Sequence, residues 1–128
     1  MRLEHIAFQV ADPAAMADWY VAHLGFGIRR RRDEPTVSRF LADGSGSILF
    51  ELYCSPKAPV PDYAGLSPTV LHIAVLSADL AADAQRLVAA GATLFSGPES
   101  SRGDHFAMLR DPWGLPLQLV RRAEPMLA

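Results

Sequence analysis

Apolar and polar side chains follow each other in an order that predicts strand, helix and then three strands in the first half of the chain. Residues 3–10, LEHIAFQV, are rich in β-branched and aromatic residues and predict a strand. Asp12 and Pro13 predict the start of a helix, because aspartate is a favourable N-cap and proline fits the first turn, and Gly25 predicts its end. The pattern predicts further strands over 27–31, 37–42 and 48–54, the last two joined by a turn at 43–46.

The second half of the chain repeats this order. A strand is predicted over 70–76, followed by a helix over 79–90 that ends at Gly91. Three more strands are predicted over 92–96, 105–110 and 116–121, with turns at 97–98 and 111–114. The fold class predicted is therefore α+β, built from two βαβββ modules.

The two halves also match residue by residue at a constant offset of 67. EHIAFQVADPAAMA at 4–17 corresponds to LHIAVLSADLAADA at 71–84, so that His5 corresponds to His72. Near the end of each half, FEL at 50–52 corresponds to LQL at 117–119, which aligns Glu51 with Gln118. Two separate segments in phase indicate an internal repeat.

The length of 128 residues fits one domain made of these two modules. Module 1 is predicted over about 1–55 and module 2 over about 70–122. Residues 55–69 hold four prolines and predict a linker over the surface. Each module is too small to bury a core comfortably alone.

Composition excludes several classes of function. Half of the residues are hydrophobic and a fifth are charged, which is typical of a globular protein with a real core. A net charge of −2 offers no electrostatic footprint for nucleic acid, and no apolar run approaches the ~20 residues of a membrane span. Cys54 is the only cysteine, so no internal disulfide can form and a cytoplasmic location is expected.

Four polar residues in phase with the repeat are the candidates for chemistry. His5, Glu51, His72 and Gln118 each stand among apolar neighbours in a predicted strand, where an unpartnered carboxylate would be costly to bury. Two imidazole nitrogens and two oxygen donors suit a divalent transition ion such as Fe, Mn, Co, Ni or Zn. The alternative is that these side chains are hydrogen-bonded core or rim residues with no ligand.

The chain resembles the vicinal oxygen chelate superfamily, which includes glyoxalase I, methylmalonyl-CoA epimerase, the extradiol dioxygenases and the fosfomycin and bleomycin resistance proteins. The resemblance rests on the paired halves, the His of LEHIAFQV, the Glu of LFELY, the His of VLHIAV and the segment RDPWGLPLQLV. It implies two modules whose curved mixed sheets form a cup around one divalent metal. By position, the metal ligands implied are His5, Glu51, His72 and Gln118.

The resemblance also implies a function. It implies a lyase or isomerase of the glyoxalase or epimerase kind, in which the metal stabilises an enolate or similar oxyanion of a small oxygenated substrate. Glu51 is then the candidate catalytic base, because Gln118 stands where most metal-dependent members have Glu and an amide cannot accept a proton. Short two-module members are commonly dimers, so a homodimer is expected, with the cup formed within one chain or across a swapped pair.

Two other functions are compatible with the same resemblance. An iron-dependent ring-cleaving dioxygenase is one, although its usual ligand triad has Glu at the place of Gln118. A non-catalytic module that binds a small molecule or antibiotic, as bleomycin resistance proteins do, is the other. Two His and a Glu retained in phase argue against the binding module.

Further residues are candidates for contacting the substrate. Arg39 and Arg110 lie in predicted strands and could reach a carboxylate or phosphate, and Tyr53 and His105 lie near the predicted cup. The run Arg29–Arg32 indicates a charged, exposed edge strand, with anion binding as the alternative.

Overall fold

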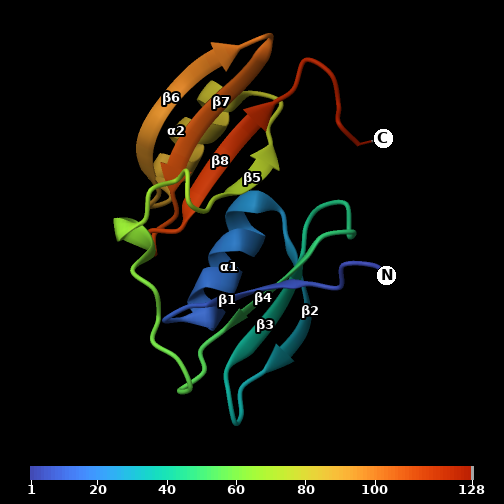
Figure 1. The fold of residues 1–128 in the computed structure, drawn as a ribbon, viewed down its shortest axis with the longest axis vertical. Coiled ribbons are helices and arrows are strands. Elements are labelled where there is room, and N and C mark those ends of the chain that lie inside the picture. The colour runs from blue at the N-terminus through green and yellow to red at the C-terminus, as the bar shows by residue number, and fades with distance from the viewer. Residues whose placement is uncertain (128) are drawn as a thin grey trace. The chain divides into compact units, whose positions relative to one another are not determined.

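The computed structural model of the chain describes residues 1–127, which form two compact units that meet between Pro61 and Asp62 in the sequence. Each unit contains one four-stranded sheet and one α-helix, in the order strand, helix and three strands (Figure 1). The predicted fold class, α+β with two βαβββ modules, is confirmed.

The first unit places its helix on one face of a mixed sheet. Its elements are β1 (Ile6–Gln9), α1 (Pro13–Leu24), β2 (Gly27–Arg32), β3 (Ser38–Ala42) and β4 (Leu49–Tyr53). The strand order is β1-β4-β3-β2, with β1 parallel to β4 and the other pairs antiparallel.

Helix α1 forms where the sequence predicts it. The Asp12 carboxylate accepts a hydrogen bond from the Ala15 amide at 3.0 Å, and Gly25 ends the helix with φ 71°, a left-handed conformation that glycine adopts without a Cβ penalty. Its apolar side packs on β3 and β4, and Tyr20 and Leu52 are both fully buried there. Helix α1 covers only this face of the sheet; the other face carries both apolar side chains, such as Phe40 and Leu49, and the polar Glu51.

The second unit repeats this architecture. A short 3-10 helix, η1 (Tyr63–Gly65), is followed by β5 (Ile73–Leu76), α2 (Leu80–Ala89), β6 (Thr93–Ser101), β7 (Asp104–Arg110) and β8 (Pro116–Arg121). The strand order is β5-β8-β7-β6, again with one parallel pair, β5 with β8. Asp79 caps α2 through the Ala82 amide at 3.0 Å, as Asp12 caps α1.

The strand registers confirm the repeat at the level of hydrogen-bonded ladders. Ala7 pairs with Glu51 across β1 and β4, and Ala74 pairs with Gln118 across β5 and β8. Both pairings are shifted by the offset of 67 seen in the sequence. The same offset therefore brings equivalent residues to equivalent places in the two sheets.

The turn predicted at residues 97–98 is wrong. β6 continues through these residues to Ser101 and accommodates Gly97 between register shifts at Leu94/Ser96 and Ser96/Glu99. A Cβ at Gly97 would lie 2.7 Å from the Phe106 carbonyl oxygen, so the close approach of β7 requires glycine here. The chain reverses instead between Ser101 and Asp104.

The histidines also stand slightly outside the strands predicted for them. β1 begins at Ile6 and β5 at Ile73, so His5 and His72 each precede their strand by one residue. In the second unit the residue opposite His72 in this register is Pro116, which has no N–H to donate to the ladder. No helix formed by residues 1–127 has the length and apolar character to cross a membrane.

Candidate functional site

The first sheet has one face against α1 and one face without it. Along β4, Phe50 and Leu52 are buried on the helix side, whereas Leu49, Glu51 and Tyr53 are half-buried on the other side. Phe40 pairs with Glu51 across β3 and β4 and so shares its face. We call this side, which carries Glu51 and Phe40, the open face.

His5 and Glu51 meet on the open face. His5 Nε2 lies 3.4 Å from Glu51 Oε2, although the two residues are 46 positions apart. The imidazole packs edge-on against the Phe40 ring at 5.4 Å between centroids. The two side chains that the sequence predicts to act together in the first half are therefore adjacent.

The other imidazole nitrogen of His5 also has a partner. His5 Nδ1 hydrogen-bonds to the Glu4 carboxylate. This hydrogen bond, with the negative charges of Glu4 and Glu51, raises the pKa of His5 above its ordinary value against the opposing effect of desolvation. A carboxylate on one ring nitrogen is also the arrangement that orients the opposite nitrogen of a metal-binding histidine.

Glu51 is held by Ser38, a residue that is not among the candidates predicted from the sequence. The Ser38 hydroxyl donates a hydrogen bond to Glu51 Oε1 at 3.0 Å, and Ser38 is only 3% exposed. This leaves Glu51 Oε2 as the oxygen that faces His5. Spacing in the sequence places Ser38 on the same face as Phe40, two residues later, but the β3–β4 register that brings Ser38 to Glu51 comes from the structure.

The separation of the two donor atoms fits a metal ion. A nitrogen and an oxygen that are each about 2.0–2.2 Å from one divalent ion, at angles of about 90–110°, lie about 3.0–3.5 Å apart. The 3.4 Å between His5 Nε2 and Glu51 Oε2 falls in this range without rearrangement. The chemistry of the pair, one imidazole and one carboxylate, also suits a divalent transition ion.

The second unit carries His72 and Gln118 at the places equivalent to His5 and Glu51. His72 Nδ1 lies 2.7 Å from the Pro68 carbonyl oxygen, which can only accept, so Nδ1 carries the hydrogen and Nε2 is free to act as a donor atom to a metal. Gln118 is half-buried in β8, opposite Ala74. Within residues 1–127, no group of three or more His, Cys, Asp or Glu lies close enough to hold a metal.

A comparison with known protein families identifies the family of this chain. Residues 2–119 match the family described as the Glyoxalase/Bleomycin resistance protein/Dioxygenase superfamily. The chain belongs to this superfamily. No curated protein matches the chain.

Several solved structures share the fold. A glyoxalase family protein from Bacillus cereus has a TM-score of 0.78 at 14% identity, covering 94% of this chain and 93% of that one. A glyoxalase I mutant from Zea mays has a TM-score of 0.75 at 24% identity, covering 96% of this chain and 46% of that one. TnmS3, an antibiotic binding protein from Streptomyces sp. CB03234, has a TM-score of 0.68 at 22% identity, covering 93% of this chain and 96% of that one.

Arg39, a candidate for substrate binding, lies on the face of the first sheet that packs against α1, not on the open face. It pairs with Leu52, so it points to the side opposite Glu51. Its guanidinium donates to the Asp33 carboxylate at 2.8 Å and to the carbonyl oxygens of Arg32 and Ser38. These bonds anchor the segment between β2 and β3.

Arg110 is also bound to the protein itself. Its guanidinium donates to the carbonyl oxygens of Tyr63, Leu66 and Gly114 at 2.9, 2.8 and 3.2 Å. It thereby links η1 to the turn at 111–114, whose Gly114 amide donates to the Asp111 carbonyl.

The two remaining candidates for substrate binding, Tyr53 and His105, lie on different kinds of face of their sheets. Tyr53 lies half-buried on the open face of the first sheet, two residues beyond Glu51. His105 is exposed on β7 and, because Met108 pairs with Gln118, lies on the face opposite Gln118. Of the four candidate substrate residues, Tyr53 shares a face with Glu51, and Arg110, which pairs with Pro116 where Met108 pairs with Gln118, shares a face with Gln118.

Proposed function

We propose that this chain is a divalent-metal-dependent lyase or isomerase of the glyoxalase or epimerase kind, acting on a small oxygenated substrate. His5, Glu51, His72 and Gln118 would hold the metal. The observation that carries this proposal is the 3.4 Å separation of His5 Nε2 and Glu51 Oε2, with the remaining atoms of both groups tied by Glu4 and Ser38. Because both side chains are fixed by these hydrogen bonds, their two metal-binding atoms stay close together and need not rearrange when a metal ion binds.

The metal, Glu51 and Ser38 would have separate roles in this reaction. When bound, the metal supplies a Lewis acid that polarises an oxygen of the substrate. Glu51 is the only carboxylate of the proposed set and takes the proton from the carbon adjacent to the carbonyl, so that the electron pair left behind is held on the carbonyl oxygen as an enolate. Ser38 keeps Glu51 Oε1 occupied, so Oε2 is the oxygen that would bind the metal and that would take the proton on leaving it.

The glyoxalase I structure among the similar folds supports this reaction class. We expect the active form to be a homodimer in the cytoplasm, since short two-module proteins of this kind commonly pair and Cys54 is the only cysteine. The substrate is a small molecule with neighbouring oxygen atoms.

A binding module is the second candidate, and Gln118 is the observation that favours it. An amide at this place lowers the charge of the ligand set relative to a second carboxylate, which weakens metal binding. TnmS3, named as an antibiotic binding protein, shows that a similar fold serves in binding. In this case the open face would hold a small molecule and release it unchanged.

Metal analysis separates the two candidates. Protein purified without chelator is analysed for Mn, Fe, Co, Ni and Zn and then titrated with each ion at micromolar concentration. We expect the parent to bind one of these ions and the variants His5→Ala and Glu51→Ala to lose that binding, while the control variants His23→Ala and Glu99→Ala keep it. Absence of micromolar binding by the parent, or unchanged binding by both site variants, would overturn the metal-dependent proposal.

A further inference from the structure

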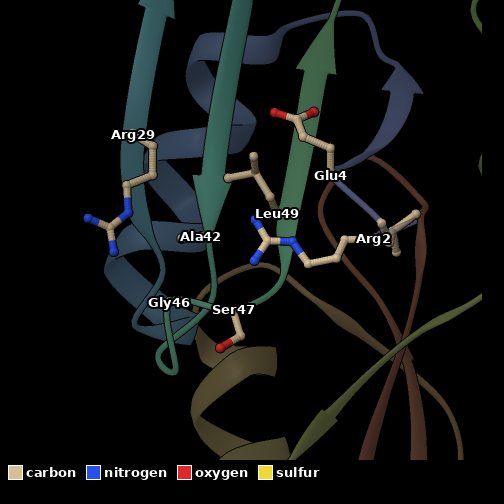
Figure 2. Close-up of a pocket in the computed structure, with 8 residues that line it drawn as sticks. Arg2, Glu4, Arg29, Ala42, Gly46, Ser47 and Leu49 are labelled. Atoms are coloured by element: carbon tan, nitrogen blue, oxygen red, sulfur yellow. The ribbon is translucent and has the colours of Figure 1, made fainter.

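A cavity lies on the open face next to the His5–Glu51 pair. It has a volume of about 600 Å³ and is formed entirely by the first unit, between the N-terminal segment, β2 and the hairpin joining β3 to β4 (Figure 2). Its floor includes Leu49 and Ala42, which pair with each other across β3 and β4. The lining residues from the N-terminal segment, β2 and the hairpin are exposed, so this is an open surface pocket, with a volume in the range of small-molecule sites.

The cavity adjoins the proposed metal ligands along the strands. Leu49 lies two residues before Glu51 on β4, so both side chains point to the same face and their Cα atoms are about 7 Å apart. Leu3, another lining residue, precedes His5 by two residues. A molecule in the cavity can therefore extend to the His5–Glu51 pair.

Two arginines give the cavity its charge. Arg2 and Arg29 both line it and come from different parts of the chain: Figure 2 shows Arg2 extending from the N-terminal segment toward Leu49, and Arg29 extending from β2 on the opposite side, away from Arg2. Neither guanidinium forms an ion pair with any residue in the part of the chain that the structure describes. The carboxylate in the lining, Glu4, is bound to His5, so the cavity keeps a net positive charge.

The position of Arg29 comes from a β-bulge. Ile28 pairs with Leu41 and Arg30 with Phe40, which leaves Arg29 as an extra residue without a cross-strand partner. Bulges of this kind redirect a side chain and often lie beside functional sites. The Arg29 side chain passes close to Gly46, because a Cβ at Gly46 would lie 3.3 Å from Arg29 Nη2.

We infer that this cavity binds an oxyanion group, a carboxylate or a phosphate, at the end of the substrate remote from the reacting carbon. Guanidinium groups match the planar oxygens of both anions through paired hydrogen bonds, and the Ser47 hydroxyl in the lining adds a neutral donor. The inference rests on the proposed function only for the other end of the molecule, which reaches His5 and Glu51. It identifies the substrate as an anionic small molecule, although the chain itself has a net charge of −2.

Anion binding tests the cavity without any metal. Chelator-treated protein is titrated with inorganic phosphate and with succinate by calorimetry, and the two probes tell phosphate from carboxylate selectivity. We expect Arg2→Ala and Arg29→Ala each to weaken binding of the preferred anion about tenfold, the effect of losing a charge-assisted hydrogen bond. Arg31→Ala is the matched control, because Arg31 lies on the same strand, carries the same charge and pairs with Arg39 on the opposite face.

A second measurement uses the unaltered chain. In a phosphate or succinate titration followed by NMR, the amides of Gly46 and Ser47 should shift, and that of Arg31 should not. Equal weakening by Arg29→Ala and Arg31→Ala, or no shift at Gly46 and Ser47, would overturn the inference. Because metal binding is measured separately, a chain that binds the anion but no metal would reject the proposed function alone, and the reverse result would reject the anion site alone.

Discussion

The Ser38 hydroxyl donates a hydrogen bond to Glu51 Oε1 at 3.0 Å and so determines which oxygen of that carboxylate faces His5. Ser38 and Glu51 stand on neighbouring strands, β3 and β4, and Ser38 is almost fully buried. A buried donor that fixes a carboxylate reduces the orientations that a metal ion or a substrate proton would meet. In metal sites, loss of such an outer partner typically lowers metal affinity by about 10- to 100-fold.

Replacing Ser38 by alanine should therefore weaken metal binding. We expect Ser38→Ala to lower the affinity for the ion that the parent prefers by about tenfold, because Glu51 then samples orientations that do not face His5. Ser38→Thr keeps the hydroxyl and should restore most of the affinity, and Ser100→Ala, on an exposed part of β6, should have no effect. Calorimetric titration measures all three, and equal affinities for Ser38→Ala and the parent would show that Ser38 only fills space.

The glutamine at position 118 offers a gain-of-function test. Gln118 occupies in the second sheet the place that Glu51 occupies in the first, each opposite an alanine of the parallel strand. If Gln118 contributes its amide oxygen to the metal, Gln118→Glu should tighten metal binding by about tenfold or more, because an added ligand charge strengthens the attraction to a divalent ion.

The control for this change is Gln85→Glu, which adds the same charge on the exposed side of α2. The same titration is applied to both variants and to the parent. A variant Gln118→Glu that binds the ion no better than Gln85→Glu would remove Gln118 from the proposed ligand set, leaving His5, Glu51 and His72.

Local signals in the sequence predicted the fold well. Asp12 and Asp79 were predicted to begin the helices, and each carboxylate accepts a hydrogen bond from an amide three residues later. The repeat at an offset of 67 predicted equivalent places for Glu51 and Gln118, and the strand registers confirm them. Caps and alternation depend on neighbours in the sequence, so they can be recognised without the tertiary structure.

Long-range partners could not be predicted in this way. Arg39 and Arg110 look alike in the sequence, yet the first binds Asp33 and the second binds three carbonyl oxygens, two of them more than 40 residues away. The Ser38–Glu51 bond and the bulge at Arg29 depend on strand register, which the sequence alone does not determine. The metal set of His5, Glu51, His72 and Gln118 remains a prediction.

The turn at 111–114 should be sensitive to a single methyl group. Gly114 has a φ of 90°, and a Cβ there would lie 2.7 Å from Ala64 Cβ and 2.8 Å from the Ala64 amide nitrogen in η1. Gly114→Ala should therefore lower the free energy of unfolding by about 1–3 kcal/mol, through backbone strain and loss of this close packing. Gly44→Ala is the matched control, because a Cβ there meets nothing within 4 Å. Thermal melts compare the two, and an equal change in Tm would mean that η1 does not rest on this turn.

Ser77 should stabilise the second unit in a manner that depends on pH. The Ser77 hydroxyl donates to Asp83 Oδ2 at 2.6 Å, and this hydrogen bond, helped by Arg86 and opposed by desolvation, holds the pKa of Asp83 below its ordinary value. A depressed carboxyl pKa stabilises the folded state above the unfolded-state pKa of about 3.9, and the stabilisation is lost as the pH falls through the folded-state value.

Ser77→Ala should thus cost about 1.5 kcal/mol at pH 7, the low end for a hydrogen bond to a charged group, because the Asp83 carboxylate is partly exposed. The difference from the parent should shrink below about pH 4, because Asp83 becomes protonated and no longer gains from the donor. Urea unfolding at a series of pH values from 7 down to about 2.5 measures this difference, with Ser100→Ala as the control for loss of an exposed hydroxyl. A difference between Ser77→Ala and the parent that stays constant across this range would show that Ser77 acts through packing and not through the charge of Asp83.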